Sequence, residues 1–336
     1  MRIEPLLKLL HRHLLRPLCV TAGILAAVWC WGAAYYTFPW PEGWEFTASL
    51  LFFLLLGLAA GGWFRGTLLA VMAALELATI FFFALRTPER AFAGVKWQRP
   101  WARAPHVELD GARAKIGNIR NFRYRAEEDF DSVYISGEYD LDQVENVDLA
   151  VSHWDGLEAV AHTMLSFGFR DGRHLAVSME TRLPEGMEQG FLPGLYKQYE
   201  ILMVLALEED LFRLRTDFRG EELYLYRTNA TPEQARTMLD SLLERAVKLE
   251  REPEFYNSIT ENCTTSLAPL LREINPSFEG DIRLLLNGRS DELLYELGYL
   301  RHREGESFAE LKRRSRVEAQ RVPAEEYSHA IRSGRE

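Results

Sequence analysis

Cys263, His162 and Glu180 have the side-chain types that thiol chemistry needs, although they lie far apart in the chain. Cys263 stands where the segment FYNSITENCTTSL changes from turn-like residues to an apolar helical pattern. The dipole and the unpaired N–H groups of a helix N-terminus favour a thiolate over a thiol. A cysteine there is either a reactive nucleophile or a small buried hydrophobic residue, and the sequence leaves both readings open.

The segment His162–Arg182 is expected to form a β-hairpin whose register follows from its side-chain pattern. A three-residue loop ending at a left-handed Gly172 separates polar from apolar residues on the two faces of the hairpin. That register places His162 opposite Glu180, with Cβ atoms about 5 Å apart. A two-residue turn would shift the pairing by one and place His162 opposite Thr181.

A carboxylate next to an imidazole fixes its tautomer and raises its basicity, so such a pair is suited to deprotonating a thiol. The alternative is a solvated cross-strand pair without a function. His153 and His174 compete with His162 for the role of base. A zinc site formed by the three candidate residues is a further alternative, although the chain contains no closely spaced ligand pair in support.

A cysteine at a helix N-terminus, packed on a sheet that bears histidine and a polar partner, is a papain-like arrangement. Three neighbours are candidates for accessory roles. Tyr256 is either an orienting hydroxyl or a packed aromatic ring, and Asn262 is expected to cap the helix. Arg182 is expected either to hold an anionic group or to pair with an acidic neighbour.

The first ninety residues contain three apolar stretches, Leu18–Tyr36, Phe46–Phe64 and Thr67–Leu85, each long enough for a membrane-spanning helix. Basic residues before the first stretch predict a cytoplasmic N-terminus, and three crossings place everything after Arg86 outside. The first stretch could instead be a signal peptide, which would not change that side. Glu76 is the only charged residue within the stretches and has either a functional role or a neutral hydrogen-bonding one.

The chain is expected to divide into a membrane anchor at residues 1–86, a juxtamembrane linker at 87–114, a catalytic domain at 115–300 and a charged tail at 301–336. The tail is expected to be a solvated helix or disordered. Strands are expected at the positions Asn118–Arg125, Asp148–His153, His162–Phe169, His174–Arg182, Tyr199–Leu207, Leu211–Phe218 and Glu222–Tyr226. Helices are expected from Thr231, at Cys263–Ile274 and at Asp291–Leu297. Locally pairing strands followed by helices indicate an α+β fold with an antiparallel sheet packed on helices.

Two compositional features limit the function. Beyond residue 90 the chain has 32 Lys and Arg against 44 Asp and Glu, so nucleic acid is a poor candidate partner. Cys19 and Cys30 lie in the first apolar stretch, which leaves Cys263 without an intramolecular disulfide partner in the large domain.

The runs AHTMLSFGF, AVSMETR and FYNSITENCTTSL resemble the Lnb N-terminal periplasmic domain family of bacterial envelope proteins over roughly residues 95–300. The family resembles permuted papain-like folds of the NlpC type, in which histidine, a polar residue and cysteine follow in that order. His162, Glu180 and Cys263 have this order. The resemblance implies acyl transfer near a membrane, in an inner-membrane protein whose C-terminal domain is periplasmic.

Three functions therefore remain open. The first is a membrane-anchored cysteine acyltransferase that moves an acyl chain from a phospholipid to the N-terminal amine of lipoproteins through a Cys263 thioester, without a metal or soluble cofactor. The second is a periplasmic cysteine hydrolase, such as a peptidoglycan amidase or endopeptidase. The third is a non-catalytic envelope module in which Cys263 is buried. Neither the acyl donor, the acceptor nor the oligomeric state follows from the sequence.

Overall fold

A computed structural model of the chain describes residues 16–37, 41, 43–61, 94–153, 161–262, 265, 268–274, 281, 283, 287–320 and 322–333. The chain divides into two compact units, Met1–Glu89 and Arg90–Glu336. Cys263, Glu76 and the expected third crossing, Thr67–Leu85, lie outside the described residues.

The described part of the first unit consists of two helices, α2 (Arg16–Thr37) and α3 (Trp44–Gly61). They coincide largely with the first two apolar stretches. Trp31 of α2 stacks on Phe52 of α3 with ring centroids 4.8 Å apart. Among the described residues, none of the helices meets the length and hydropathy required of a membrane span. The three predicted crossings are therefore unconfirmed.

The second unit is built around a nine-stranded sheet with the order β1-β2-β9-β8-β7-β6-β10-β11, and β5 also pairs with β2. The strands of this sheet are β1 (His106–Asp110), β2 (Arg113–Arg120), β5 (Tyr134–Asp140), β6 (Val144–His153), β7 (Ala161–Phe169), β8 (His174–Arg182), β9 (Glu200–Ala206), β10 (Glu222–Arg227) and β11 (Arg316–Val317). β2 and β9 are parallel, and the other pairs are antiparallel. A separate two-stranded sheet joins β3 (Arg123–Tyr124) to β4 (Phe130–Asp131).

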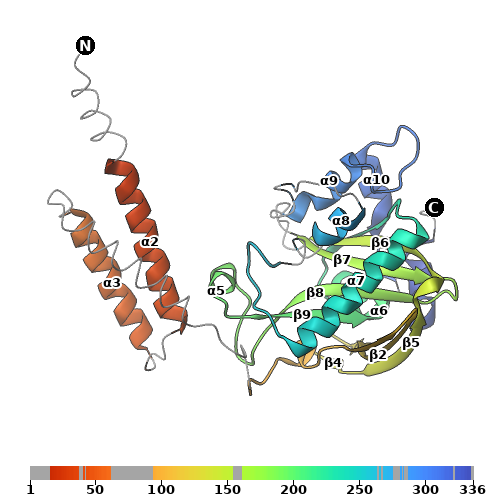
Figure 1. Cartoon of the computed structure of the whole chain (residues 1–336), viewed down its shortest axis with the longest axis horizontal. Coiled ribbons are helices and arrows are strands. Elements are labelled where there is room, and N and C mark those ends of the chain that lie inside the picture. The colour runs from red at the N-terminus through yellow and green to blue at the C-terminus, as the bar shows by residue number, and fades with distance from the viewer. Residues whose placement is uncertain are drawn as a thin grey trace, which may run out of the picture. The chain divides into compact units, whose positions relative to one another are not determined.

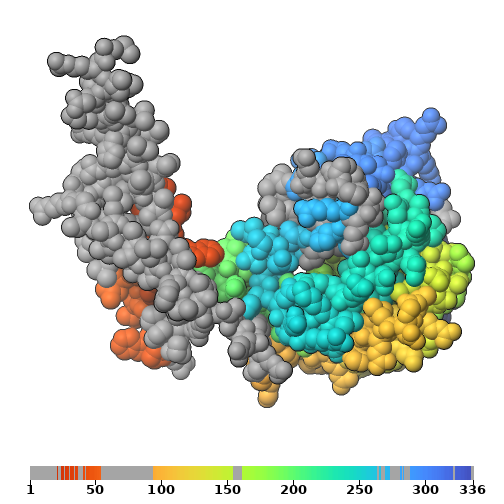
Figure 2. Space-filling model, viewed as in Figure 1, coloured from red at the N-terminus to blue at the C-terminus, as the bar shows by residue number. Residues whose placement is uncertain are grey.

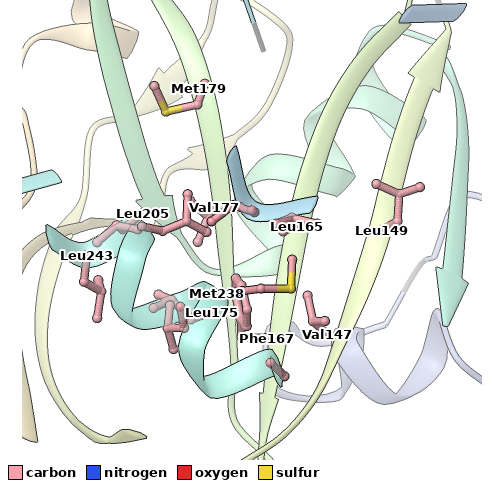
Figure 3. Packing of buried hydrophobic residues seen from close by; sticks show 14 of the residues in the cluster. Val147, Leu149, Leu165, Phe167, Leu175, Val177, Met179, Leu205, Met238 and Leu243 are labelled. Carbon is pink, nitrogen blue, oxygen red and sulfur yellow. The ribbon is translucent and has the colours of Figure 1, made fainter. Parts of the chain in front are cut away.

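Helix α7 (Pro232–Arg251) covers one face of the sheet, which we call the α7 face, and crosses in front of the strands in Figure 1. The predicted capping box is present: the Thr231 side chain accepts from the Gln234 N–H, and the Gln234 side chain accepts from the Thr231 N–H. Apolar residues at helical spacing, among them Met238 and Leu243, are buried against the strands. Figure 3 shows Met238 and Leu243 meeting side chains of β6 to β9. The same core contains residues of α8 (Ala268–Ile274), α9 (Ser290–Glu296) and α10 (Phe308–Ser315).

The opposite face, which we call the α6 face, carries a second core. Met164 of β7 and Ala176 of β8 pack there with Phe212 of α6 (Glu208–Arg213). Tyr327 of α11 (Tyr327–Ala330) and Ile331 belong to the same core and are completely buried. Because strand residues alternate between faces, each strand of the hairpin contributes to both cores. The sequence-based α+β assignment is confirmed, with helices on both faces of a mainly antiparallel sheet.

Three sequence-based boundaries are wrong. Leu211–Phe218 is not a strand, because α6 continues into a π-helical turn at Leu214–Phe218. The predicted tail is folded, since β11 pairs with β10 and α11 closes the second core. The predicted linker contains β1, which pairs with β2 at the edge of the sheet.

A further short helix, α5 (Phe191–Leu195), precedes β9. In the space-filling view, α7 and the blue C-terminal segments form much of the near surface of this unit (Figure 2).

Candidate functional site

The β7–β8 hairpin has the predicted three-residue loop and the predicted register. Gly172 is left-handed at φ +84°, and the Gly172 N–H donates to the carbonyl of Phe169. Met164 lies opposite Ser178 and Ser166 opposite Ala176, as expected. The loop needs a residue without a Cβ at the left-handed position, and Gly172 supplies it. The alternation of polar and apolar residues then fixes the two faces.

The hairpin brings His162 and Glu180 together on the α6 face. His162 Nε2 lies 3.1 Å from Glu180 Oε1, and both side chains are largely buried, with 13% and 15% of their surface exposed. Ser178 bridges them: its Oγ lies 2.6 Å from His162 Nε2 and donates a bond of 2.6 Å to Glu180 Oε1. The predicted pair is therefore confirmed as a structural contact.

These contacts assign the tautomer of His162. The single hydroxyl hydrogen of Ser178 is donated to Glu180, so His162 Nε2 must supply the hydrogen in its bond to Ser178. In a neutral imidazole, Nδ1 then carries the lone pair. When the Nε2 hydrogen of an imidazole is directed at a carboxylate, the imidazole accepts a further proton at Nδ1.

Arg215 adds a positive charge that the sequence analysis missed. Its Nη2 donates to Glu180 Oε1 at 3.4 Å, and its Nη1 donates to the carbonyl of Leu211 at 2.8 Å. Burial alone raises the pKa of the Glu180 carboxyl, but the neighbouring His162, Arg215 and Ser178 hold this pKa well below its usual value. Glu180 is consequently an ionised partner.

A second carboxylate lies on the other side of Arg215. Glu221 Oε2 is 3.7 Å from Arg215 Nε and accepts a bond of 2.6 Å from Ser152 Oγ. The run Glu208–Asp210 could have revealed this arrangement, because three acidic residues in succession are typical of a helix N-terminus. A helix that starts there, in place of the predicted strand, carries Arg215 onto the α6 face.

Asn262 and Thr265, which lie on either side of Cys263 in the sequence, bond to one another. Asn262 Oδ1 accepts from the Thr265 N–H at 2.9 Å, and Thr265 Oγ1 accepts from the Asn262 N–H at 2.8 Å. Asn262 is buried. The described helix α8 begins at Ala268, so the capping role of Asn262 stays a prediction that these two bonds support, and Cys263 directly follows Asn262 in the sequence.

The segment that leads to the cap runs beside one end of the sheet. Phe255 bridges to Glu200 at the start of β9, and the Tyr256 N–H donates to the carbonyl of Tyr199 at 2.9 Å. Glu180 lies opposite Leu202 in the same region of the sheet. The segment and the His162–Glu180 pair thus share one end of the sheet. The described residues of α8 pack on the α7 face, however, which is the face opposite the pair.

The other candidate residues have structural contacts. The Tyr256 ring packs near that of Tyr199, with centroids 6.4 Å apart, which fits the reading of a packed aromatic. Arg182 Nη1 donates to Glu200 Oε1 at 2.7 Å, and its guanidinium lies over the Trp97 ring, so it pairs with an acidic neighbour.

The competing histidines lie apart from Glu180. His153 is buried, and its ring meets that of Tyr224 edge-on at 5.8 Å. His174 stands at the opposite end of β8, where burial lowers the pKa of its imidazole. Within the described ranges, no group of three His, Cys, Asp or Glu side chains could hold a metal ion.

Comparison with known proteins identifies one region of the chain. Residues 131–288 match the family described as the Lnb N-terminal periplasmic domain, and this range includes His162, Glu180 and Cys263. The resemblance to this family is thereby confirmed, whereas the likeness to papain-like folds stays a prediction. The match supports a periplasmic domain of an envelope protein. None of the curated proteins and none of the solved structures gives a significant match.

Proposed function

We propose, from the premise that residues 131–288 belong to the Lnb N-terminal periplasmic domain family, that this domain is a thiol-dependent acyltransferase of the bacterial envelope. Cys263 is the nucleophile, His162 is the general base and Glu180 orients the imidazole. A phospholipid is the acyl donor, and the N-terminal amine of a diacylated lipoprotein is the acceptor.

The contact of His162 Nε2 with both Ser178 and Glu180 carries the proposal. It leaves Nδ1 as the proton acceptor, and an ionised Glu180 stabilises the imidazolium that forms. General-base catalysis of this kind contributes about 10²–10⁴-fold to a rate.

The reaction proceeds in two steps. The Cys263 thiol transfers its proton to His162 Nδ1, and Sγ attacks an ester carbonyl of the phospholipid. The carbonyl–oxygen bond breaks, the proton passes to the departing alkoxide, and a thioester and a lysophospholipid result. The lipoprotein amine then attacks the thioester and gives up a proton to His162, so that an amide forms and the thiol is restored.

Two further observations support this assignment. Asn262 and Thr265, on either side of Cys263 in the sequence, bond to one another in the pattern of a helix cap, and a helix N-terminus at Cys263 would favour a thiolate. The segment from Phe255 to Asn262 lies at the same end of the sheet as His162.

The apolar stretches before residue 86 support a membrane anchor in this proposal. An anchored domain would meet its lipid donor at a high local concentration, which lowers the entropic cost of bringing the reactants together.

Mass spectrometry of the full-length protein, purified from bacterial membranes, tests the proposal. An acyl adduct on Cys263 is expected in the wild type, and it should be absent from Cys263→Ala and strongly reduced in His162→Ala. His174→Ala is the matched control, because it removes a histidine from the far end of the same hairpin. The role of Cys263 would be refuted by a wild-type protein without an acyl adduct. It would also be refuted by acylation elsewhere in the protein that persists in Cys263→Ala.

A further inference from the structure

An uncharged pocket lies on the α7 face of the sheet. It has a volume of about 270 Å³ and lies between β6, β7 and the helices that cover them. Its apolar wall includes Val147, Leu149, Leu165, Met238, Leu270 and Leu294. Figure 3 shows Val147, Leu149 and Leu165 on adjacent strands with Met238 approaching from α7.

Two polar side chains in the pocket lack a partner. Ser290 and Tyr299 line the pocket, and their hydroxyl oxygens are buried and form no hydrogen bond with any of the described residues. Ser290 is only 1% exposed. Buried hydroxyls are normally hydrogen-bonded, so two unsatisfied ones in one pocket indicate a missing acceptor or donor.

The lining restricts the chemistry of the ligand. None of the described residues that line the pocket is charged, and among them a phosphate or an ammonium group would be desolvated without a counter-charge. The volume is slightly below the range of about 300–1,000 Å³ typical of small-molecule sites. A single flexible apolar chain with an uncharged oxygen acceptor at one end meets both conditions, whereas a whole diacyl lipid is too large.

We propose that this pocket binds one acyl chain of a phospholipid, with Ser290 and Tyr299 donating hydrogen bonds to its ester oxygen. The choice of ligand rests on the proposed function. The pocket and His162 lie on opposite faces of the same strand, β7, since Thr163 lines the pocket and directly follows His162. Leu270 lines the pocket seven residues after Cys263 in the sequence.

Photo-cross-linking tests the pocket without requiring turnover. The full-length Cys263→Ala protein is placed in lipid nanodiscs with a phosphatidylethanolamine that carries a diazirine at the end of one acyl chain. After irradiation, cross-links are expected on the peptides that contain Leu165, Met238 or Leu270. Cross-links confined to the apolar N-terminal segments or to the exposed surface would overturn the proposal.

Two bulky substitutions near the start of α7 provide a matched pair. Ala230 lines the pocket and precedes the helix cap, so Ala230→Trp should fill the pocket and reduce these cross-links at least fivefold. Glu233→Trp adds the same bulk on the exposed side of the first helical turn and should change them less than twofold. Equal labelling of the two variants, with unchanged thermal unfolding, would contradict the assignment.

Ser290→Ala provides a variant that does not depend on tolerance of a large side chain. It should lower labelling by the ester-linked probe about threefold and leave labelling by the corresponding ether-linked probe unchanged, because the ether lacks the carbonyl acceptor. An equal effect on both probes would show that Ser290 does not contact the ester.

The adduct experiment separates this proposal from the proposed function. Pocket cross-links without an acyl adduct on wild-type Cys263 would support the pocket and refute the acyltransferase. An adduct without pocket cross-links would do the reverse.

Discussion

His162 Nε2 lies 3.1 Å from Glu180 Oε1, across two neighbouring strands of the sheet. The two residues are joined a second time through the hydroxyl of Ser178. This double contact distinguishes the pair from an ordinary surface pair, because both side chains are largely buried and Arg215 donates to the same carboxylate oxygen. The first two predictions concern this arrangement.

Glu180→Gln should lower acyl transfer by about 10²-fold or more, because it removes the negative charge that stabilises the imidazolium. An amide can still accept the hydrogen bond from Ser178, so the position of His162 should change little. Formation of the Cys263 adduct, followed over time in membranes, measures the effect. Glu138→Gln is the control, since Glu138 is exposed. Undiminished adduct formation in Glu180→Gln would exclude Glu180 from the mechanism.

Ser178→Ala should reduce the rate of adduct formation less than Glu180→Gln does, by about tenfold. The direct contact between His162 and Glu180 remains, and the variant loses a hydrogen bond to an ionised carboxylate, which is worth about 1.5–3 kcal/mol. Ser166→Ala is a matched control, because Ser166 donates to Glu208 on the same face but away from His162. A rate as low as that of Glu180→Gln would mean that the direct contact does not suffice to orient the ring.

Arg332→Met should destabilise the fold by about 3–5 kcal/mol, because it removes the guanidinium that lies between two buried carboxylates. Arg332 Nη1 donates to Glu208 Oε2 at 2.8 Å, and Arg332 Nη2 donates to Asp148 Oδ2 at 2.8 Å. Chemical denaturation of the full-length protein measures the loss. Arg301→Met, at an exposed position, should stay within about 0.5 kcal/mol of the wild type.

The same ion pairs predict a pH dependence of stability. Burial alone raises the pKa of the Glu208 carboxyl, but Arg332 lowers this pKa to about 2. In the unfolded chain the group titrates near its ordinary value of 4.5. Its stabilising contribution is therefore complete above pH 4.5 and is lost as the pH falls towards 2. Glu208→Gln should flatten this part of the stability curve, and an unchanged slope between pH 4.5 and 2 would contradict the assignment.

Ending the chain at Ser315 should prevent cooperative folding of the second unit. The truncation removes β11 from the sheet and exposes Leu223 and Leu225 on the α6 face, while Tyr327 and Ile331 are lost from the second core. Limited proteolysis and circular dichroism can detect the change. Removal of only the residues after Ser333 should leave the described core intact. A stable, protease-resistant product that ends at Ser315 would show that the second unit folds without this segment.

Local patterns in the sequence were sufficient to predict the hairpin and the capping of α7. Each depends on residues that are close in the chain or on the period of two that a strand imposes. The alternation of polar and apolar residues in Leu211–Phe218 wrongly suggested a strand. These residues form helical turns that bury charged as well as apolar side chains, so the sequence shows no single apolar stripe at helical spacing.

The sequence by itself determined which residue types were available for thiol chemistry and how His162 and Glu180 face one another across one turn. Only the tertiary structure decided that Arg215 joins Glu180, and that Arg332 reaches Asp148 across 184 positions to anchor the C-terminal segment. Contacts between such distant residues depend on the packing of whole elements around two cores. A prediction that takes a helix for a strand, or a buried segment for a solvated one, therefore assigns the wrong partners to a charged side chain. No local pattern in the sequence reveals that mistake.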